Sequence, residues 1–367
     1  MSKCRTTISL LAFGLLGLAA CGQGAGQAGN AEKAKGSAGA GEADRIAIVG
    51  SSTVFPFSSA VAEKFSAAGQ FKTPRVESTG TGGGFSVFCK GVGAGTADIA
   101  NASRPIKKSE FDECVKNGVT EITEVKLGYD GIVIASGKAG PKLNVTKYEI
   151  YQALAKELYD PATKSFVANP NITWNQINPA LPNIKIDVMG PPPTSGTRDA
   201  FVELVMEKGA VGSVDMKALK ESDEAEFKKR ATTLREDGAW KDSGENDNLI
   251  VQALSRSPEQ FGVFGFSSFE ENADRLQEAS IDGVQANVEN IVSGEYGAAR
   301  SLFFYVKKAS VGVVPGVKEF AIEMMSDQAA GARGYLRGRG MVPLKPEERE
   351  ASAATVASMT TMVAPSK

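Results

Sequence analysis

Short apolar runs along the chain alternate with segments of helical periodicity. The strand-like runs, most of them apolar, occupy residues 45–49, 75–77, 97–100, 121–127, 131–135, 184–189, 261–266 and 301–306. Apolar residues recur every three or four positions in segments 57–65, 109–117, 147–156, 201–208, 249–255 and 317–325. Such alternation predicts an α/β fold in which mostly parallel sheets carry helices on both faces.

The length of the chain predicts two lobes. The 324 residues from Asp44 onward exceed what one hydrophobic core commonly holds. After Asp44, the sequence has no glycine-rich or proline-rich stretch long enough to be a linker, so we expect the chain to cross between the lobes twice. A strand pattern resumes at residues 302–306 and suits the return crossing. The predicted boundaries are 44–131 plus 300–367 for lobe I and 132–299 for lobe II.

Four turns rich in serine, threonine, glycine and arginine lie beside these predicted elements. They are Gly50-Ser51-Ser52-Thr53-Val54-Phe55-Pro56, Ser78-Thr79-Gly80-Thr81-Gly82-Gly83-Gly84-Phe85, Asn101-Ala102-Ser103-Arg104-Pro105 and Thr194-Ser195-Gly196-Thr197-Arg198. The first N–H groups of a helix lack intrahelical partners and attract negative charge. An arginine can add a bidentate guanidinium to such a site. One such turn is an ordinary helix cap, but four at the carboxyl ends of strands predict an anion-binding cradle.

The N-terminal segment predicts export. Residues 1–5 are basic, and the apolar run 8–18 is too short to span a bilayer, which favours a signal peptide at 1–20. Leu18-Ala19-Ala20-Cys21 resembles the bacterial lipobox, which implies a lipidated Cys21 and a lipid anchor in the cell envelope, on the periplasmic side of the inner or outer membrane. A plain secretory signal cut near Ala20 is the alternative. Residues 21–43, rich in glycine and alanine, are predicted to form a flexible tether.

Two further cysteines, Cys89 and Cys114, belong to the predicted folded part. In an oxidising envelope they are expected to form a disulfide, and two free buried thiols are the alternative.

Composition excludes several classes of function. The chain has no histidine, which excludes Ser/His/Asp catalysis and histidine metal sites. The loop 80–84 lacks the Gly-Lys-Ser/Thr ending of a nucleotide-binding P-loop. The formal net charge of −2 does not favour nucleic acid. We therefore expect neither an enzyme nor a protein that holds a metal or cofactor.

Together, the order and spacing of the four turns resemble those of the extracytoplasmic phosphate-binding protein of the phosphate ABC transporter, the PstS family. The resemblance implies a monomeric, two-lobed periplasmic binding protein that closes over inorganic phosphate and delivers it to an ABC permease of the inner membrane. By position, the first-lobe ligands would be Ser52, Thr53, the backbone at Val54 and Phe55, Thr81 and Ser103. Those of the second lobe would be Ser195, Gly196, Thr197 and Arg198.

Two departures from the family pattern shape the expected site. The family's usual carboxylate is replaced by Ser103, so Asp130 is the candidate acceptor for the phosphate proton or a partner of an arginine. A structural aspartate at the interlobe crossing is the alternative. The usual arginine before Ser195 is missing, so Arg198 would carry the principal charge, with Arg104 as a second source.

Other functions stay open at this point. They are binding of another oxyanion such as sulfate, molybdate or tungstate, a serine hydrolase without histidine, or a surface adhesion protein.

Overall fold

A computed structural model describes residues 44–244 and 246–366 of this chain. The predicted signal peptide, Cys21 and the whole predicted tether therefore lie outside the described residues. Within the described ranges, no helix combines the length and the apolar character that a bilayer crossing needs.

The fold is built on a nine-stranded sheet, counted over the described residues. Its order is β2-β1-β3-β13-β4-β10-β8-β9, and β11 pairs with β4. The bounds are β1 Ala47–Gly50, β2 Arg75–Ser78, β3 Ile99–Ala102, β4 Ile122–Gly137, β8 Val188–Gly190, β9 Trp240–Asp242, β10 Phe261–Gly265, β11 Leu276–Glu278 and β13 Ala299–Lys307. β1 is parallel to β2 and β3, and β8 is parallel to β9 and β10. The predicted α/β class is confirmed.

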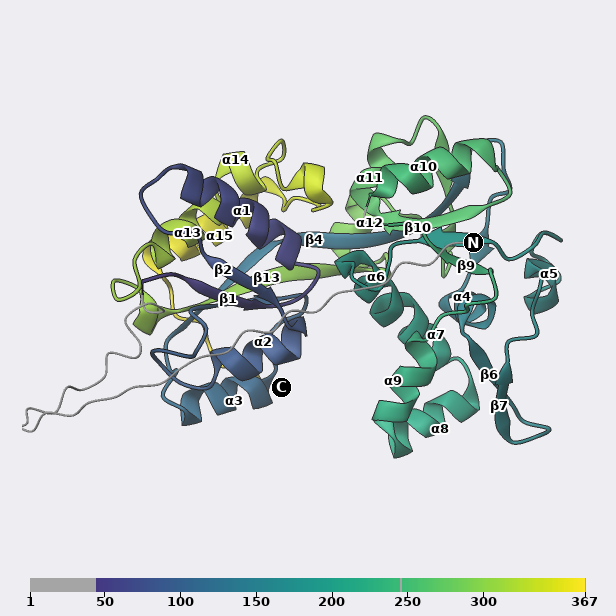
Figure 1. Ribbon diagram of the computed structural model, residues 1–367, viewed down its shortest axis with the longest axis horizontal. Coiled ribbons are helices and arrows are strands. Elements are labelled where there is room, and N and C mark those ends of the chain that lie inside the picture. The colour runs from purple at the N-terminus through teal and green to yellow at the C-terminus, as the bar shows by residue number, and fades with distance from the viewer. Residues whose placement is uncertain (1–43, 245, 367) are drawn as a thin grey trace, which may run out of the picture. The chain divides into compact units, whose positions relative to one another are not determined.

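Two long antiparallel strands, β4 and β13, join the two parts of the sheet (Figure 1). Residues 122–131 of β4 pair with β13, whereas residues 132–136 pair with β10. The sequence predicts separate strands at 121–127 and 131–135, but β4 continues through both. Gly128 does not form a turn, because it lies where a Cβ would come within 2.8 Å of Met341 Cγ and 2.9 Å of Val342 O. This glycine allows close packing within a continuous strand.

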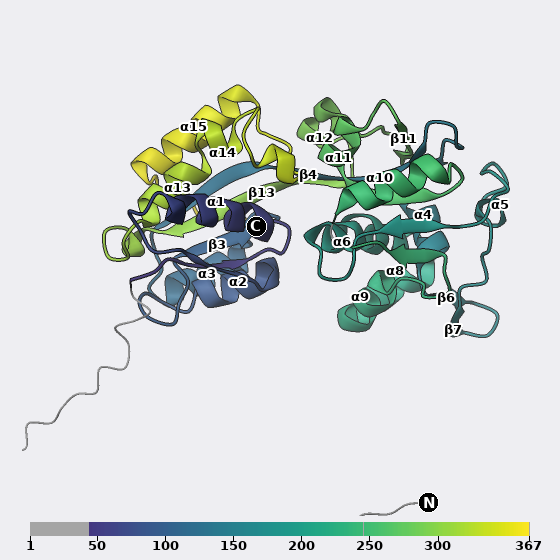
Figure 2. The ribbon, with the colours of Figure 1, turned by 45° about the horizontal axis from the view of Figure 1, so that its top comes forward.

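Helices cover both faces of the first part of the sheet (Figures 1 and 2). On one face lie α1 Phe55–Ala67, α13 Val317–Met324, α14 Asp327–Ala330 and α15 Pro346–Ser358; on the other lie α2 Gly80–Phe88 and α3 Lys108–Lys116. Short 3₁₀ turns follow β13 and precede α15, at Lys308–Ser310 and Arg337–Arg339. This arrangement is the first lobe of the two-lobed fold.

The second lobe surrounds β8, β9, β10 and β11. Its helices are α4 Lys147–Leu154, α5 Trp174–Ile177, α6 Gly196–Phe201, α7 Glu207–Ala210, α8 Val214–Ser222, α9 Glu224–Thr232, α10 Asp247–Arg256, α11 Phe266–Glu271 and α12 Val288–Ser293. A π-helical turn, Val202–Met206, joins α6 to α7. Two small sheets pair β5 Asn144–Val145 with β12 Ser280–Ile281, and β6 Glu157–Asp160 with β7 Ser165–Ala168.

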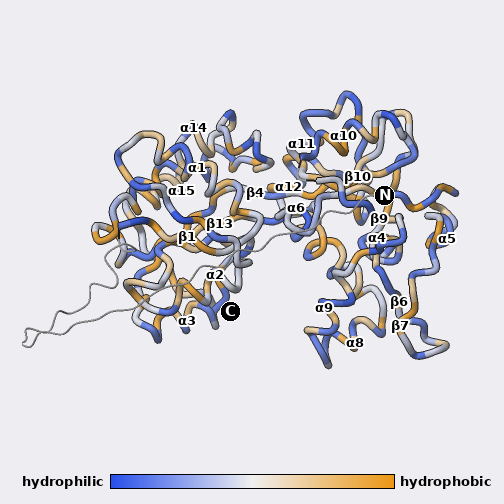
Figure 3. Tube along the Cα trace, in the orientation of Figure 1, coloured by the Kyte–Doolittle hydropathy of each residue, from blue (hydrophilic) through white to orange (hydrophobic). Residues whose placement is uncertain are grey.

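Apolar side chains from the strands and the inner helix faces form the core. In the tube view, hydrophobic colour gathers around β1 and β13 inside the first lobe (Figure 3). In the second lobe every residue of β10 is buried. Phe261, Phe264, Phe266 and Phe269 are all at least nine-tenths buried, as expected for core packing. Burying each such ring stabilises the fold by roughly 1.5–3 kcal/mol.

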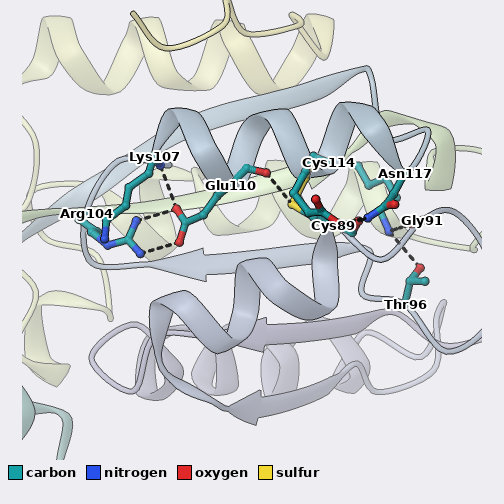
Figure 4. The surroundings of a disulfide bond; sticks show 10 residues. Cys89, Gly91, Thr96, Arg104, Lys107, Glu110, Cys114 and Asn117 are labelled. Carbon is teal, nitrogen blue, oxygen red and sulfur yellow. Dashed lines mark hydrogen bonds and ion pairs between the residues drawn. A yellow bond between two sulfur atoms is a disulfide. The ribbon is translucent and has the colours of Figure 1, made fainter. Parts of the chain in front are cut away.

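Cys89 and Cys114 form a disulfide that joins the end of α2 to α3 (Figure 4). The predicted pairing is confirmed. Asn117 Nδ2 donates a hydrogen bond of 2.8 Å to the carbonyl of Cys89, which fixes the same corner. With a sequence separation of 25, the closed loop contributes roughly 3–4 kcal/mol in the chain-entropy model. The bond therefore stabilises α2, whose first turn carries Thr81.

Candidate functional site

Three of the four polar turns lie together at one edge of the first lobe. β1, β2 and β3 are adjacent and parallel, so their carboxyl ends share that edge. Thr81, in the first turn of α2, and Ser103, just after β3, have hydroxyl oxygens 3.1 Å apart. The backbone N–H of Ser103 also donates to Thr81 Oγ1 at 3.1 Å. The structure thus brings Thr81 and Ser103 into direct contact.

Two glycines permit the close packing of these turns. A Cβ on Gly50 would lie 2.1 Å from the carbonyl oxygen of Asn101, and its φ of +135° is in the region that favours glycine. A Cβ on Gly84 would lie 2.5 Å from Cα of Gly50. The end of β1 can therefore approach both the turn after β3 and the helix α2.

The turn after β1 places its hydroxyl groups just before α1. Val54 is the N-cap residue and is fully buried, and the N–H of Phe55 donates to Ser51 O at 2.9 Å. Thr53 is buried and Ser52 is half-buried. Pro56 occupies the first turn of α1, where a missing N–H breaks no helical hydrogen bond.

The second lobe contributes the fourth turn, between β8 and α6. Ser195 is the N-cap residue of α6, and its hydroxyl accepts a hydrogen bond from the N–H of Thr197 at 3.2 Å. Ser195 is 8 % exposed. Ser195 N–H donates to Pro192 O at 3.0 Å, so the proline-rich stretch 191–193 folds back onto the cap.

The first and fourth turns meet, although they are far apart in the sequence. A Cβ on Gly196 would lie 2.6 Å from Ser52 O and 2.7 Å from Cα of Thr53. Thr53 Oγ1 donates to Gly196 O at 3.3 Å, and the hydroxyl of Ser52 donates to the carboxylate of Asp199. Burial raises the pKa of Asp199, and the hydrogen bond from Ser52 lowers it in part. Only a glycine fits at position 196 in this contact.

Arg198 points toward an acidic and aromatic pair in its own lobe. Its Nη1 donates to Asp242 Oδ1 at 2.8 Å and to Pro191 O at 3.1 Å. Its guanidinium carbon lies 4.6 Å from the centroid of the Trp240 ring. Burial lowers the pKa of Arg198, and the hydrogen bond to Asp242 offsets this in part. Both hydrogen bonds start from Nη1, so a guanidinium with five donors keeps further donors for another acceptor.

Arg104 uses both of its terminal nitrogens in hydrogen bonds within the protein. Its Nη1 and Nη2 donate to the two carboxylate oxygens of Glu110 on α3, at 2.8 and 2.7 Å (Figure 4). This bidentate hydrogen bond raises the pKa of Arg104. Arg104 lies near the glycine-rich turn, with its Nη2 4.0 Å from the place of a Cβ on Gly82.

Asp130 lies on β4 directly opposite Arg300 on β13. It is 5 % exposed, and its Oδ2 is buried without a hydrogen-bond partner among the described residues. Burial raises the pKa of Asp130 to about 6, although Arg300 lowers it; Glu203 raises it further. The structure places this aspartate between the two lobes, at the crossing of the chain.

Arg300 is the site residue that sequence reasoning missed. Its Nη2 donates to Thr53 Oγ1 at 2.6 Å, and its Nη1 forms an ion pair with Glu203 of the π-helical turn. No local motif marks it, because it is a single arginine at the start of a strand. The only signal was its position just before the return crossing, which the strand pattern at 302–306 predicts.

The four turns bring together hydroxyl groups, amides and arginines, and the nearby carboxylates pair with these groups. Within the described residues, no three histidine, cysteine, aspartate or glutamate side chains form a group that could hold a metal ion. Neutral donors and guanidinium groups around a half-buried contact are suited to binding a small oxyanion.

Comparisons with known proteins agree with this chemistry. A model of the PBP superfamily domain matches residues 35–328. Protein SphX of Synechococcus elongatus is 33% identical over 274 residues, which cover 71% of this chain and 69% of that protein. The phosphate-binding protein PstS of Staphylococcus epidermidis is 31% identical over 328 residues, covering 87% and 84%.

Solved structures show the same fold. A possible phosphate binding protein from Planctomyces limnophilus superposes with a TM-score of 0.68 at 27% identity, covering 86% of this chain and 98% of that one. An ABC-type phosphate transport receptor from Vibrio cholerae has a TM-score of 0.54 at 19% identity, covering 82% and 100%. At this lower identity the second likeness concerns the fold alone.

Proposed function

We propose that this chain, which belongs to the PBP superfamily and within it to the PstS family of phosphate-binding proteins, captures inorganic phosphate between its two lobes. The observation that carries the proposal is the contact of Ser52 and Thr53 with Gly196, which joins the polar turns of both lobes. The chain binds its ligand and does not transform it.

The proposed ligands come from all four turns. Those of the first lobe are Ser52, Thr53, the backbone at Val54 and Phe55, Thr81, Ser103 and Arg104, and those of the second are Ser195, Gly196, Thr197 and Arg198. Many fixed neutral donors and a few guanidinium groups can hold a dianion in a cleft of low dielectric constant. The likeness to proteins named for phosphate binding favours phosphate over other oxyanions.

Isothermal titration of the purified protein with phosphate, arsenate and sulfate tests this function. We expect phosphate and arsenate to bind, because they share shape and protonation, and sulfate to bind far more weakly. Binding of sulfate with no binding of phosphate would favour the second candidate, a protein for another oxyanion. The observation that supports this candidate is Ser103 at the position of the family's carboxylate.

We propose Asp130 as the group that separates phosphate from sulfate. Phosphate near neutral pH carries a proton that an ionised carboxylate can accept, whereas sulfate offers only acceptors. With its pKa raised to about 6, Asp130 is ionised at pH 7 and protonated at pH 5. A protonated Asp130 can donate to a sulfate oxygen, so the discrimination depends on pH.

Sulfate affinity should therefore rise as the pH falls from 7 to 5. A group with a pKa of about 6 changes from about one-tenth to about nine-tenths protonated over this range, so the rise in sulfate affinity should reach about tenfold at most. Asp130→Asn should bind sulfate better at pH 7 and lose this pH dependence, because its amide donates at both pH values. Titration of both proteins with sulfate at pH 5 and pH 7 measures the effect. Identical pH profiles would show that Asp130 only maintains the fold.

We also propose lobe boundaries of 44–131 plus 300–367 and 132–299. The change of strand partner on β4 after Gly131 supports the first boundary, and the pairing of Ala299 with Gly131 supports the second. The chain then crosses twice along adjacent strands, which allows the lobes to move about one hinge. A monomer of this kind delivers its ligand to an ABC permease of the inner membrane.

We propose that Cys21 is lipidated and holds the protein in the periplasm at the inner or outer membrane. Cys21→Ala should release the protein into the aqueous phase without changing phosphate affinity, because a flexible tether separates anchor and site. Detergent partitioning of the variant beside the unmodified chain is the measurement. Retention of the variant in the detergent phase would contradict the proposal.

A further inference from the structure

Arg300 contacts residues of both lobes. It is at the start of β13, in register with Asp130 of β4, where the two strands pass between the lobes (Figure 1). Its side chain is 11 % exposed. Nη2 donates to Thr53 in the first lobe, and Nη1 pairs with Glu203 in the second. One guanidinium therefore touches a proposed anion ligand and a carboxylate of the facing lobe.

Two buried polar atoms at this position make no hydrogen bond with the described residues. Arg300 Nε and Asp130 Oδ2 are both buried, and neither has a hydrogen-bond partner among the described residues. They are 3.8 Å apart, which is too long for a hydrogen bond. The two groups form an ion pair, but a buried donor and a buried acceptor that make no hydrogen bond are costly, so their presence side by side points to a third group that completes both.

Arg104 shows what a purely internal pairing looks like in this protein. Both of its terminal nitrogens donate to the two oxygens of one carboxylate, that of Glu110. The Glu110 side chain is 19 % exposed and is fixed on α3. Among residues 44–244 and 246–366, Arg300 has no such bidentate partner, and the side chain of Glu203 is 53 % exposed. Glu203 can turn into solvent, whereas Glu110 is fixed.

We propose that Arg300 binds the captured oxyanion directly, beside Thr53, and that Glu203 competes with the anion for the same guanidinium. The proposal rests on the phosphate-binding function proposed above and names a residue of that same site. In the absence of the anion, a carboxylate oxygen of Glu203 takes the place of an anion oxygen on Nη1. When the anion arrives, Glu203 moves away, and Arg300 and Arg198 together balance the charge of a dianion.

Two variants should therefore change phosphate affinity in opposite directions. Arg300→Gln removes the charge while keeping a donor, and should weaken phosphate binding by about 30-fold or more. Arg300→Lys should not restore it, because an ammonium group lacks the planar fork. Glu203→Gln removes the competing carboxylate and should tighten binding by about threefold. If the ion pair between Arg300 and Glu203 only stabilises the fold, both Arg300→Gln and Glu203→Gln should bind phosphate more weakly than the unmodified protein or equally well.

The measurement is titration calorimetry of the full chain with inorganic phosphate at pH 7. Arg256→Gln and Glu221→Gln are the controls for net charge, because both side chains are exposed and belong to helices of the second lobe. Circular dichroism melting shows whether each variant folds. If Arg300→Gln does not fold, Glu203→Gln decides alone.

The outcomes separate this inference from the function on which it rests. An unmodified protein that does not bind phosphate contradicts the proposed function. An unmodified protein that binds phosphate, with a folded Arg300→Gln variant within about threefold of it, overturns the role of Arg300 and leaves the function intact. If Glu203→Gln binds phosphate no more tightly than the unmodified protein, Glu203 does not compete with the anion for Arg300.

Discussion

Replacing Gly196 with alanine is expected to remove most of the phosphate affinity while leaving both lobes folded. The added methyl group would lie 2.6 Å from Ser52 O, 2.8 Å from the Ser52 carbonyl carbon and 2.7 Å from Cα of Thr53. These are backbone atoms, which cannot turn aside as a flexible side chain does. The turn of the second lobe would then be held away from the turn of the first.

The expected loss is large because several ligand contacts depend on this approach. A hydrogen bond to a charged group contributes roughly 1.5–3 kcal/mol, so losing two of them costs about 3–6 kcal/mol. This corresponds to about a hundredfold to ten-thousandfold in the dissociation constant. Titration calorimetry with phosphate measures the loss directly.

Gly338→Ala is the matched control for this substitution. Gly338 is exposed, and a Cβ at that position would meet nothing within 4 Å. It should bind phosphate as the unmodified protein does, and both variants should melt at the same temperature without phosphate. Normal affinity in Gly196→Ala would mean that phosphate does not require the contact between these turns.

Arg198→Ala is expected to weaken phosphate binding by roughly 2–5 kcal/mol, or about 30-fold to several thousand-fold. The substitution removes a guanidinium held in place by Asp242 and by the face of Trp240. Such an arginine is already oriented, so little freedom is lost when it binds an anion. The variant also removes the ion-pair partner of the half-exposed Asp242 carboxylate, which keeps only the hydrogen bond of 2.7 Å from Trp240 Nε1.

The lysine variant separates geometry from charge at this position. Arg198→Lys keeps the charge but cannot reproduce the planar fork or the stacking on Trp240, so it should recover only a small part of the affinity. Phosphate titration of both variants at pH 7 provides the comparison. Near-normal affinity in Arg198→Ala would exclude this residue from the site.

The fold was largely accessible from the sequence because its signals are local. Alternating strand and helix patterns predict the α/β class, and the two cysteines of the folded part predict the disulfide that joins α2 to α3. The sequence did not indicate that β4 is one continuous strand from Ile122 to Gly137. Gly128 resembles a break in the strand, and only the packing of Met341 against it shows why glycine is needed there.

Only those residues of the candidate site that are clustered in sequence motifs could be predicted from the sequence. The sequence predicts Thr81 and Ser103 as ligands of one lobe, and the structure places their hydroxyl groups 3.1 Å apart. Arg300 could not be found in this way, because its contacts with Thr53 and Glu203 depend on how β4 and β13 pair. Arg300 pairs with Asp130, which lies 170 residues earlier in the chain, and the sequence around Arg300 does not indicate this pairing.

A crystal structure of the protein grown with phosphate tests the central proposal most directly. We expect one phosphate between the two lobes, with its oxygens within about 3.2 Å of donors on Thr53, Gly196 or Thr197, Arg198 and Arg300. The Glu203 carboxylate should have left Arg300, and Asp130 should face the protonated oxygen. A phosphate bound elsewhere, or a contact between Thr53 and Gly196 that contains no anion at saturating phosphate, would contradict the proposal.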